Sequence, residues 1–430
     1  MKVSICWFRR DLRLEDNTAL HMALANESAV LPLFIFDSDI LKELPEDDAR
    51  LSFIHNEIYT MNEELLKKES SFLTMHGTPL EIWENVLKEY EVTAVYVNKD
   101  YEPYALKRDK EVASFLAKKG IDFHAFKDQV IFEENDVLKN DGKPYTIYTP
   151  FKNKWLSQFD KTKHLPIKNS KFQNLHIANI PLLTLGKLGF TKSTKKVKPF
   201  TLKEVDEYEI MRNFPAKDGT SYLSPHLRFG TISVRQIIQK LKSTDAVFLS
   251  ELVWREFFMQ ILFHFPKVVT ESFKPKYDNI RWRNNTQDFE RWCEGETGYP
   301  MVDAGMRQLN ETGYIHNRVR MVVASFLCKH LLIDWRWGEA YFAKKLLDYD
   351  LSANNGNWQW AAGTGCDSAP YFRIFNPIEQ LKKFDKDLIY TRKWVKNLNE
   401  FSYPQPMVDH KGARARALTT YKEGINSYSD

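Results

Sequence analysis

The sequence is poor in the features that mark secreted, metal-binding and membrane proteins. Its 430 residues include only 4 cysteines, and none is spaced from another cysteine or a histidine like the ligands of a structural zinc ion or an iron–sulfur cluster. We therefore expect free thiols in a reducing compartment and no metal. No apolar run reaches membrane-spanning length, and charge follows the first residues too early for a signal peptide, so we expect a cytoplasmic protein.

Phosphate-binding glycine motifs and internal repeats are also missing. The 17 glycines form no GxGxxG or Walker motif, which gives no support for a nucleotide-binding loop of the usual kind. Basic and acidic side chains are equal in number up to residue 200, so the net charge of +4 lies after it. This is a weak indication of a polyanionic partner, and ordinary surface charge explains it as well.

The first 130 residues alternate short apolar runs with helical patterns. Helical periodicity covers Asp48–Lys67 and Ala105–Lys119, for example. This alternation predicts an α/β domain with a doubly wound, Rossmann-like parallel sheet, which could hold a ligand at a strand end. The predicted strands are Val3–Phe8, Ala29–Phe36, Phe72–His76, Val92–Val97 and Phe123–Phe126.

The remaining chain is divided into a connector and a helical domain. A length of 430 residues exceeds what one core usually organises, so we expect an α/β domain over 1–130, an interdomain connector over 131–200 and an all-α domain over 201–430. Ser233 and Thr286 are the candidate N-caps. The predicted helices are Leu202–Asn213, Ser233–Lys242, Ala246–His264, Gln287–Glu294, Pro300–Thr312, Arg318–Leu331 and Trp337–Leu347.

The stretch from His316 to Trp360 mixes polar groups into apolar helical sequence. One helical stripe carries Asn317, Arg320, Met321 and Ala324, and the stretch continues to Asp348, Asp350, Asn354 and Asn355. Because a buried charge needs a partner, we expect Arg320 to pair with Asp348 or Asp350. We interpret this region as the floor of a ligand pocket.

Three further stretches could carry chemistry. In Asp218–Gly230, hydroxyl groups surround turn residues, and a phosphate site and a simple capping loop are equally plausible. Glu251, Trp254 and Arg255 share one helical face, which suits either a buried salt bridge or the recognition of a planar base. By themselves, Trp282, Trp335 and Trp358 are ordinary core or surface aromatics.

Taken together, these stretches resemble the photolyase and cryptochrome family nearly from end to end. The shared blocks include WFRRDLRLEDN, TSYLSPHLRFG, ELVWREF, HNRVRM, NNGNWQWAAGTG and YPQPMVDHK. Within the family, the sequence is most similar to bacterial class I cyclobutane pyrimidine dimer photolyases. The resemblance implies an amino-terminal α/β domain, a carboxy-terminal helical domain that binds one FAD, and UV-damaged DNA as the partner of a monomer that does not contact a membrane.

The resemblance also implies the residues of the FAD site. Asn354 would face N5 of the flavin, and Arg320 paired with Asp348 would place positive charge near the reduced ring. The implied FAD contacts are Tyr208, Thr220, Ser221, Leu223, Ser224, Arg255, Asn317, Arg320, Asp348, Asp350 and Asn354.

A lesion pocket and an electron path follow from the same resemblance. Light would excite FADH−, whose electron would split the ring of a flipped-out dimer and then return. Trp358, Trp335 and Trp282 would carry electrons from the surface to an oxidised flavin. The implied lesion contacts are Glu251, Trp254, Asn317, Arg318, Met321 and Trp360.

Two alternatives and the antenna stay open. A six-four photolyase typically has a histidine where this chain has Asn317 and lacks Met321, so HNRVRM favours the cyclobutane dimer; a signalling cryptochrome without repair is the other alternative. Folate-binding relatives tend to have an Asn-Glu pair after the motif that begins YE. Here Tyr101 and Glu102 are followed by Pro103, Tyr104 and Ala105, so that second acidic residue is missing. A deazaflavin, a folate, a second flavin or no antenna are possible, in a pocket near Phe36, Asp37 and Tyr101.

Overall fold

The computed structural model describes residues 2–27 and 29–428, which form two compact units. The first unit comprises Met1–Asp136, Ser157–Phe200 and Tyr222–Ser243, and the second comprises Val137–Leu156, Thr201–Ser221 and Thr244–Asp430. Each unit is therefore built from three separate segments of the chain.

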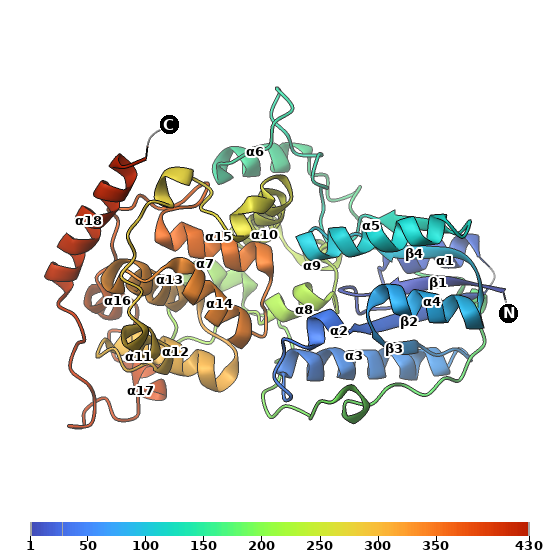
Figure 1. The fold of residues 1–430 in the computed structure, drawn as a ribbon, viewed down its shortest axis with the longest axis horizontal. Coiled ribbons are helices and arrows are strands. Elements are labelled where there is room, and N and C mark those ends of the chain that lie inside the picture. Colours follow the sequence, from blue (N-terminus) through green and yellow to red (C-terminus); the bar gives the residue numbers. More distant parts are fainter. Residues whose placement is uncertain (1, 28, 429–430) are drawn as a thin grey trace. The chain divides into compact units, whose positions relative to one another are not determined.

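A five-stranded parallel sheet forms the centre of the first unit (Figure 1), as predicted. The strand order is β3-β2-β1-β4-β5, and β1 pairs with β2 and β4, for example through Ile5 with Leu31 and Val95. Each predicted apolar run became a strand, because such runs bury both faces of a parallel sheet. The strands are β1 (Lys2–Phe8), β2 (Val30–Asp37), β3 (Leu73–Gly77), β4 (Glu91–Asn98) and β5 (Asp122–Phe126).

Helices cover both faces of this sheet. Side chains of α1 (Thr18–Asn26) and α3 (Ala49–Leu66) share one apolar core with the sheet, and side chains of α4 (Pro79–Glu89) and α5 (Pro103–Ala117) share the other. The short helix α2 (Ser38–Leu41) follows β2 directly, and Asp37 caps it. The doubly wound arrangement is thus confirmed.

Two later segments complete the first unit. Residues 159–200 contain no α-helix or strand, and apolar residues such as Leu175 and Leu188 pack into the core beside α1 and α3. The helices α8 (Leu223–Phe229) and α9 (Val234–Lys240) follow. The predicted N-cap Ser233 is confirmed, since its hydroxyl accepts a hydrogen bond from the amide of Gln236.

The second unit is helical. Its main core is built largely from the helices between Thr286 and Ala362, and a smaller core lies where Tyr421 meets Tyr277 and Ile280. Its helices are α6 (Tyr148–Gln158), α7 (Tyr208–Met211), α10 (Ala246–His264), α11 (Thr286–Glu294), α12 (Pro300–Thr312), α13 (Asn317–Ser325), α14 (Trp335–Lys345), α15 (Leu351–Ala362), α16 (Pro377–Phe384), α17 (Ile389–Trp394) and α18 (His410–Asn426).

For this unit, one predicted N-cap and one predicted helix were wrong, and another helix differs from the prediction in its type. Thr286 is the first residue of α11, and the cap is Asn285, whose side chain accepts from the amide of Asp288. The helix predicted over Leu202–Asn213 shrinks to a short 3₁₀ turn and α7, because only Val205 of that segment is buried. The helix predicted over Arg318–Leu331 is confirmed in its bounds to within one residue, but it changes from α-helix to π-helix at Phe326–Leu331 before the C-cap Leu332, whose φ is +51°.

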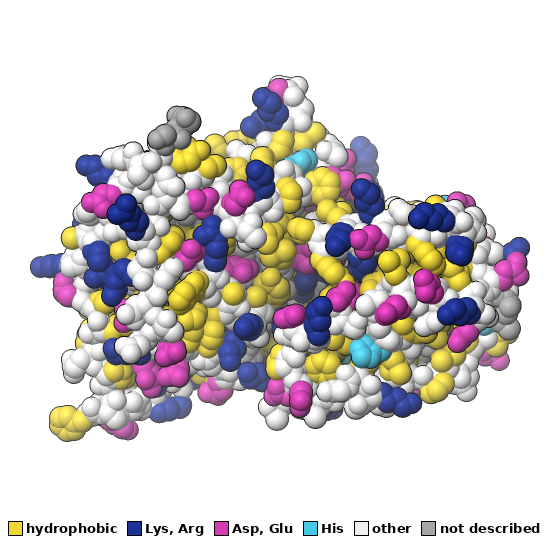
Figure 2. Space-filling view, viewed as in Figure 1, with side chains coloured by type: hydrophobic (Ala, Val, Ile, Leu, Met, Phe, Trp, Pro, Cys, Tyr) yellow, Lys and Arg dark blue, Asp and Glu magenta, His cyan; other side chains and the backbone are white. Residues whose placement is uncertain are grey.

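Surface and cysteine properties are ordinary. On the sides that Figure 2 shows, basic and acidic side chains are interspersed over both units. All four cysteines are free thiols. Within residues 2–27 and 29–428, no cluster of three or more His, Cys, Asp or Glu side chains could hold a metal ion, and no helix is long and apolar enough to cross a membrane.

Candidate functional site

The helix α15 is the centre of the candidate site in the second unit. It packs against α10 and against α13, so the residues predicted on these three helices come together. The approach to α10 depends on Gly356, because a Cβ atom at this position would lie 2.1 Å from Cδ1 of Phe258. A side chain larger than glycine would force the two helices apart.

The predicted pairing of Arg320 is confirmed. Its Nη2 lies 2.8 Å from Oδ2 of Asp348, and its Nε donates to the carbonyl of Ile315 at 2.9 Å. The Arg320 side chain is 30% exposed and that of Asp348 only 7%. The carboxylate of the ion pair is therefore buried, whereas the guanidinium is partly accessible to a ligand. Asp350 instead caps α15, where it accepts from the amide of Ala353 and the hydroxyl of Ser352.

Asn354 is oriented by a residue that the sequence did not single out. Its Nδ2 donates to Oε1 of Glu339 at 2.7 Å and to the Glu339 carbonyl at 3.1 Å. Burial raises the pKa of Glu339, and the hydrogen bond from Asn354 opposes that shift. Both hydrogen bonds hold the NH₂ group towards α14, which leaves the amide oxygen of Asn354 as the end that can accept a hydrogen bond from a ligand.

Glu251 forms an ion pair with Arg212, a partner that the pattern of its own helix did not indicate. Its Oε1 lies 2.6 Å from Nη1 of Arg212, and the two side chains are 32% and 26% exposed. Burial raises the pKa of Glu251, while Arg212 lowers it. The pair therefore holds a partly buried carboxylate, still about one-third exposed, at the site.

Arg318 is also held by groups that the sequence analysis missed. Its Nη2 donates to Oδ1 of Asn213 at 2.7 Å, and its guanidinium lies 4.3 Å from the ring centroid of Phe384. Burial lowers the pKa of Arg318, as do Arg212 and Arg373. Three arginines thus gather near one another, which suits an anionic ligand.

The amino terminus of α13 carries the other predicted contacts. His316 caps the helix by accepting from the amide of Arg318, and Asn317 is exposed immediately after it. Burial, followed by Arg320 and Arg318, lowers the pKa of His316 to about 4, so this ring is neutral at physiological pH. Met321, further along α13, and Trp360, on α15, are half-buried.

Trp254 stacks on Tyr148, which the sequence analysis did not consider. Their ring centroids are 3.5 Å apart and their planes differ by 9°. The two residues lie on α10 and α6, more than 100 positions apart in the chain, so no local pattern could have indicated the contact.

The remaining predicted cofactor contacts fall on both sides of a unit boundary. Tyr208 begins α7, with its ring against Phe248, and burial raises its pKa to about 12. Arg255 lies on α10. Thr220 and Ser221 belong to the second unit, whereas Leu223 and Ser224 open α8 in the first.

The three predicted electron-transfer tryptophans share the main core of the second unit. Trp358 and Trp335 are buried in it, and Trp282 packs against it from a half-buried position. Trp358 lies directly over Gly338 of α14, the helix that begins at Trp335. Trp282 contacts the ring of Tyr421, with centroids 5.7 Å apart.

The predicted antenna residues lie at the carboxyl ends of the strands in the first unit. Asp37 ends β2 and accepts a hydrogen bond from the Tyr104 hydroxyl at 2.5 Å. Arg10, just after β1, reaches Asp100 and Glu102, just after β4, at 3.1 and 2.9 Å. The strand order reverses between β1 and β4, which is where ligands bind in sheets of this kind.

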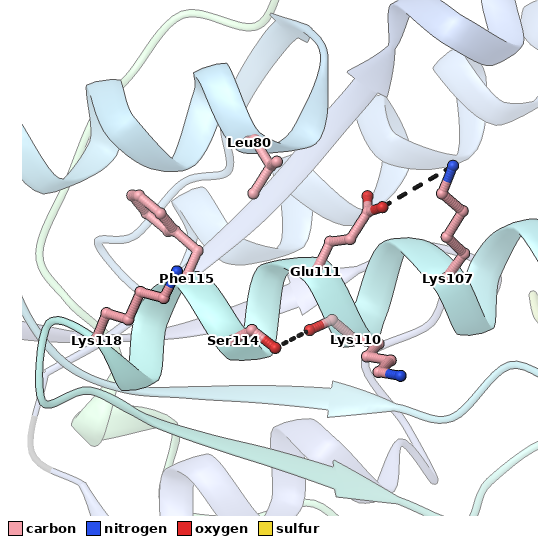
Figure 3. A pocket seen from close by; sticks show the side chains of 7 residues that line it. All are labelled: Leu80, Lys107, Lys110, Glu111, Ser114, Phe115 and Lys118. Carbon is pink, nitrogen blue, oxygen red and sulfur yellow. Dashed lines mark hydrogen bonds and ion pairs between the residues drawn. The ribbon is translucent and has the colours of Figure 1, made fainter.

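A surface hollow elsewhere in the first unit contains none of the predicted site residues. It has a volume of about 610 Å³ and is lined by Leu80, Lys107, Lys110, Glu111, Ser114, Phe115 and Lys118. Figure 3 shows Lys107 beside Glu111, and the Ser114 hydroxyl bonded to the carbonyl of Lys110. The lysines extend along an exposed helix face.

Comparison with known proteins identifies the family. Residues 4–169 match the family described as DNA photolyase, and residues 248–402 match the FAD binding domain of DNA photolyase. A deoxyribodipyrimidine photo-lyase of Synechococcus sp. is 35% identical over 97% of this chain and 96% of its own length. The chain belongs to the photolyase and cryptochrome family.

Solved structures of photolyases have the same fold. A bacterial class III photolyase from Agrobacterium tumefaciens aligns with a TM-score of 0.88 and 34% identity, over 99% of this chain and 98% of that one. An archaeal photolyase from Sulfolobus tokodaii, solved with two FAD molecules, gives a TM-score of 0.85 and 36% identity, over 98% and 100%. The photolyase fold expected from the resemblance is thus confirmed.

The matched FAD binding domain covers most of the site on α15. Glu251, Trp254, Arg320, Asp348 and Asn354 all lie within residues 248–402. Arg212, Asn213 and Tyr148 lie outside that segment, although they contact residues inside it. This photolyase-family chain therefore completes its site with residues from two earlier segments.

Proposed function

We propose that this protein is a light-driven DNA repair enzyme that splits cyclobutane pyrimidine dimers. The observation that carries the proposal is the site on α15. There, a polar set suited to a flavin and an acidic–aromatic set suited to two linked pyrimidines lie on helices that pack together. The relatives named deoxyribodipyrimidine photo-lyase support the same reaction.

The residues of the site fit FAD. The Arg320–Asp348 pair presents a partly exposed guanidinium, which suits an anionic ring, and the amide oxygen of Asn354 can accept a hydrogen bond from N5 of the reduced form. Glu339 holds that amide so that it cannot rotate freely. When bound in reduced form and excited by blue light, FAD supplies the electron that splits the cyclobutane ring.

The second set of residues would bind the lesion. Trp254 and Trp360 offer flat apolar surfaces to the two pyrimidines, and the Glu251 carboxylate, held by Arg212, can accept hydrogen bonds from base edges. Arg318 lies on the same side of α13 as Met321 and can contact a backbone phosphate. Because two adjacent bases stacked inside a duplex cannot reach such a site, the dimer must leave the helix.

We also propose an antenna chromophore at the reversal point between β1 and β4. The carboxylates of Asp37, Asp100 and Glu102 and the guanidinium of Arg10 offer hydrogen bonds there. The Sulfolobus tokodaii relative holds two FAD molecules, which makes a second flavin a specific candidate beside a deazaflavin or a folate. Heat release of chromophores from purified protein, followed by fluorescence and chromatography, would identify the occupant.

The first experiment compares two lesions. Reduced protein is mixed with oligonucleotides that contain either a cyclobutane dimer or a six-four photoproduct, and repair under blue light is compared with a dark control. We expect light-dependent loss of the cyclobutane dimer alone. If flavin is bound and reducible but neither lesion is repaired, the signalling cryptochrome becomes the leading alternative. Repair of the six-four product would contradict the proposed substrate.

A variant separates lesion binding from cofactor binding. Trp360→Ala removes a stacking surface, so it should weaken binding of dimer-containing DNA by about tenfold while FAD content stays unchanged. Trp394→Ala, which changes another half-buried tryptophan packed against the same core, is the matched control. Equal losses in both variants would show that the effect is structural.

A further inference from the structure

Besides its ring contact with Trp254, Tyr148 forms hydrogen bonds through its backbone amide and through its hydroxyl group. It is the first residue of α6, and its backbone amide donates to Oδ2 of Asp367 at 3.0 Å. Its hydroxyl lies 2.7 Å from the carbonyl oxygen of Ser250 and 2.6 Å from the Ser250 hydroxyl. The side chain is buried, with 6% of its surface exposed.

The anchor at Ser250 is one helical turn before Trp254. In an α-helix the carbonyl of residue 250 is the partner of the amide of residue 254, so the Tyr148 hydroxyl bonds to the turn that positions the indole. Burial raises the pKa of Tyr148 well above its usual value, so the hydroxyl stays neutral and can donate throughout the physiological range.

The stacking geometry is not the one that two aromatic rings prefer by themselves. Aromatic pairs favour offset or edge-to-face arrangements because a face-to-face sandwich places like partial charges together. The centroids of Tyr148 and Trp254 are 3.5 Å apart at 9°, which is close to a direct sandwich. The bonds to Ser250 and Asp367 therefore hold Tyr148 in place against Trp254.

This arrangement limits what the indole can do. Tyr148 covers one face of the Trp254 indole. The ring centroids of Phe257 and Phe258 lie 5.6 and 5.4 Å from that of Trp254. Trp254 remains half-buried, so part of it still reaches solvent. A ring that is held in this way loses little conformational entropy when a base stacks on it, which increases affinity.

We propose that Tyr148 is a positioning residue for lesion recognition. It holds the plane of Trp254 so that its exposed surface is ready to stack on an extruded pyrimidine, and the hydroxyl bond to Ser250 sets that plane. The inference rests on the proposed function, since it gives Trp254 a role in binding the dimer. It predicts a defect in selective DNA binding rather than in FAD binding.

The test compares three variants in dark binding assays. Tyr148→Leu removes the stacked ring, Tyr148→Phe removes only the hydroxyl, and Phe289→Leu removes a ring that is stacked on Trp292, with centroids 5.7 Å apart at 19°. Fluorescence anisotropy gives the Kd for a dimer-containing oligonucleotide and for the same sequence without damage, and absorbance gives the FAD content.

The expected results differ between the variants. Tyr148→Leu should weaken binding of the dimer-containing oligonucleotide about tenfold and Tyr148→Phe about threefold, with undamaged DNA and FAD content unaffected, because stacking supplies on the order of 1–3 kcal/mol per base. At DNA concentrations that saturate Tyr148→Leu, repair per absorbed photon should return towards the wild-type value. Phe289→Leu should leave the ratio of the two Kd values unchanged.

Other outcomes overturn the inference. If both Tyr148 variants bind the two oligonucleotides as the wild type does, Tyr148 does not position Trp254. The same conclusion follows if affinity for damaged and undamaged DNA falls equally. If the wild type itself does not prefer the dimer, the proposed function fails first, and this result is distinct from a defect confined to the variants.

Discussion

The two units differ in the partners of their buried ionisable groups. In the first unit, Arg235 pairs with Asp16 at 2.9 Å and with Asp128 at 2.8 Å, and Arg13 pairs with Asp128 from the other side. Burial by itself would raise the pKa of Asp128, but Arg13 and Arg235 outweigh it and hold that pKa below its usual value. The charges neutralise one another and join segments that are far apart in sequence.

In the second unit, several buried ionisable groups bond to neutral partners. Nζ of Lys329 donates to the carbonyl of Ala362 at 2.6 Å and lies 3.7 Å from the ring centroid of Tyr421, and His330 bonds to His410 at 2.9 Å. Burial lowers the pKa of Lys329 to about 7. At the proposed site of the same unit, Glu251 and Arg320 form ion pairs and remain about one-third exposed.

The difference suggests two uses of polar groups. A closed network of ion pairs stabilises one conformation, whereas charged groups that stay partly exposed at a site cost stability and can bind a ligand. Removing a buried charge should therefore lower the stability of the first unit, and removing a buried amine should raise that of the second.

The largest expected effect is in the first unit. Asp128→Asn keeps the shape of the side chain but leaves Arg13 and Arg235 with reduced compensation, so the free energy of unfolding should fall by about 3–5 kcal/mol. Urea unfolding followed by circular dichroism measures this change. Asp141→Asn, which alters an exposed carboxylate, is the control and should change stability by less than about 0.5 kcal/mol.

The opposite sign is expected for Lys329→Met. The pKa of Lys329 is about 7 in the folded protein and near its ordinary value in the unfolded chain, so between these pH values the unfolded state binds more protons. Wild-type stability should therefore rise with pH through this window by up to about 1.4 kcal/mol per pH unit from this residue.

The variant lacks this contribution. Its advantage over the wild type should be greatest near pH 7 and should shrink by about 2–3 kcal/mol up to pH 9.5 in urea titrations. Lys107→Met, at a lysine that is 75% exposed, should follow the wild-type curve. A constant difference across the pH range would show that Lys329 is charged in the folded state throughout.

The sequence could predict the features that depend on nearby residues, but not the contacts between distant segments. All five strands and the bounds of α10 and α12 follow from local burial patterns, and Arg320 could be matched with Asp348 because both lie in one polar stretch. Arg235 with Asp16, and Tyr148 with Trp254, could not be matched. Their partners lie more than 100 residues away, and periodicity within a helix carries no information about which distant segment covers it.

A smaller effect of acid is expected at His330. Burial, then His410 and Arg416, lowers its pKa to about 3, so below pH 6.5 the unfolded chain takes up a proton that the folded protein does not. Stability should fall with pH from this residue, by about 1–2 kcal/mol between pH 6.5 and 5. His330→Gln should remove that part of the loss, while His76→Gln, at an exposed position, should not.

The smallest effect on stability, and the most specific on function, is expected for Trp282→Phe. Trp282 is half-buried and touches Tyr421 at the edge of the core, so the smaller ring should cost roughly 1 kcal/mol or less. If Trp282 is the outer end of the proposed electron path, photoreduction of bound flavin should slow by at least about tenfold, while repair by enzyme reduced beforehand should equal that of the wild type. Trp394→Phe is the matched control for both measurements. Loss of repair in the pre-reduced Trp282→Phe protein would show that this tryptophan takes part in the repair step itself. The residues that repair requires would then extend from the proposed site to the surface of the second unit.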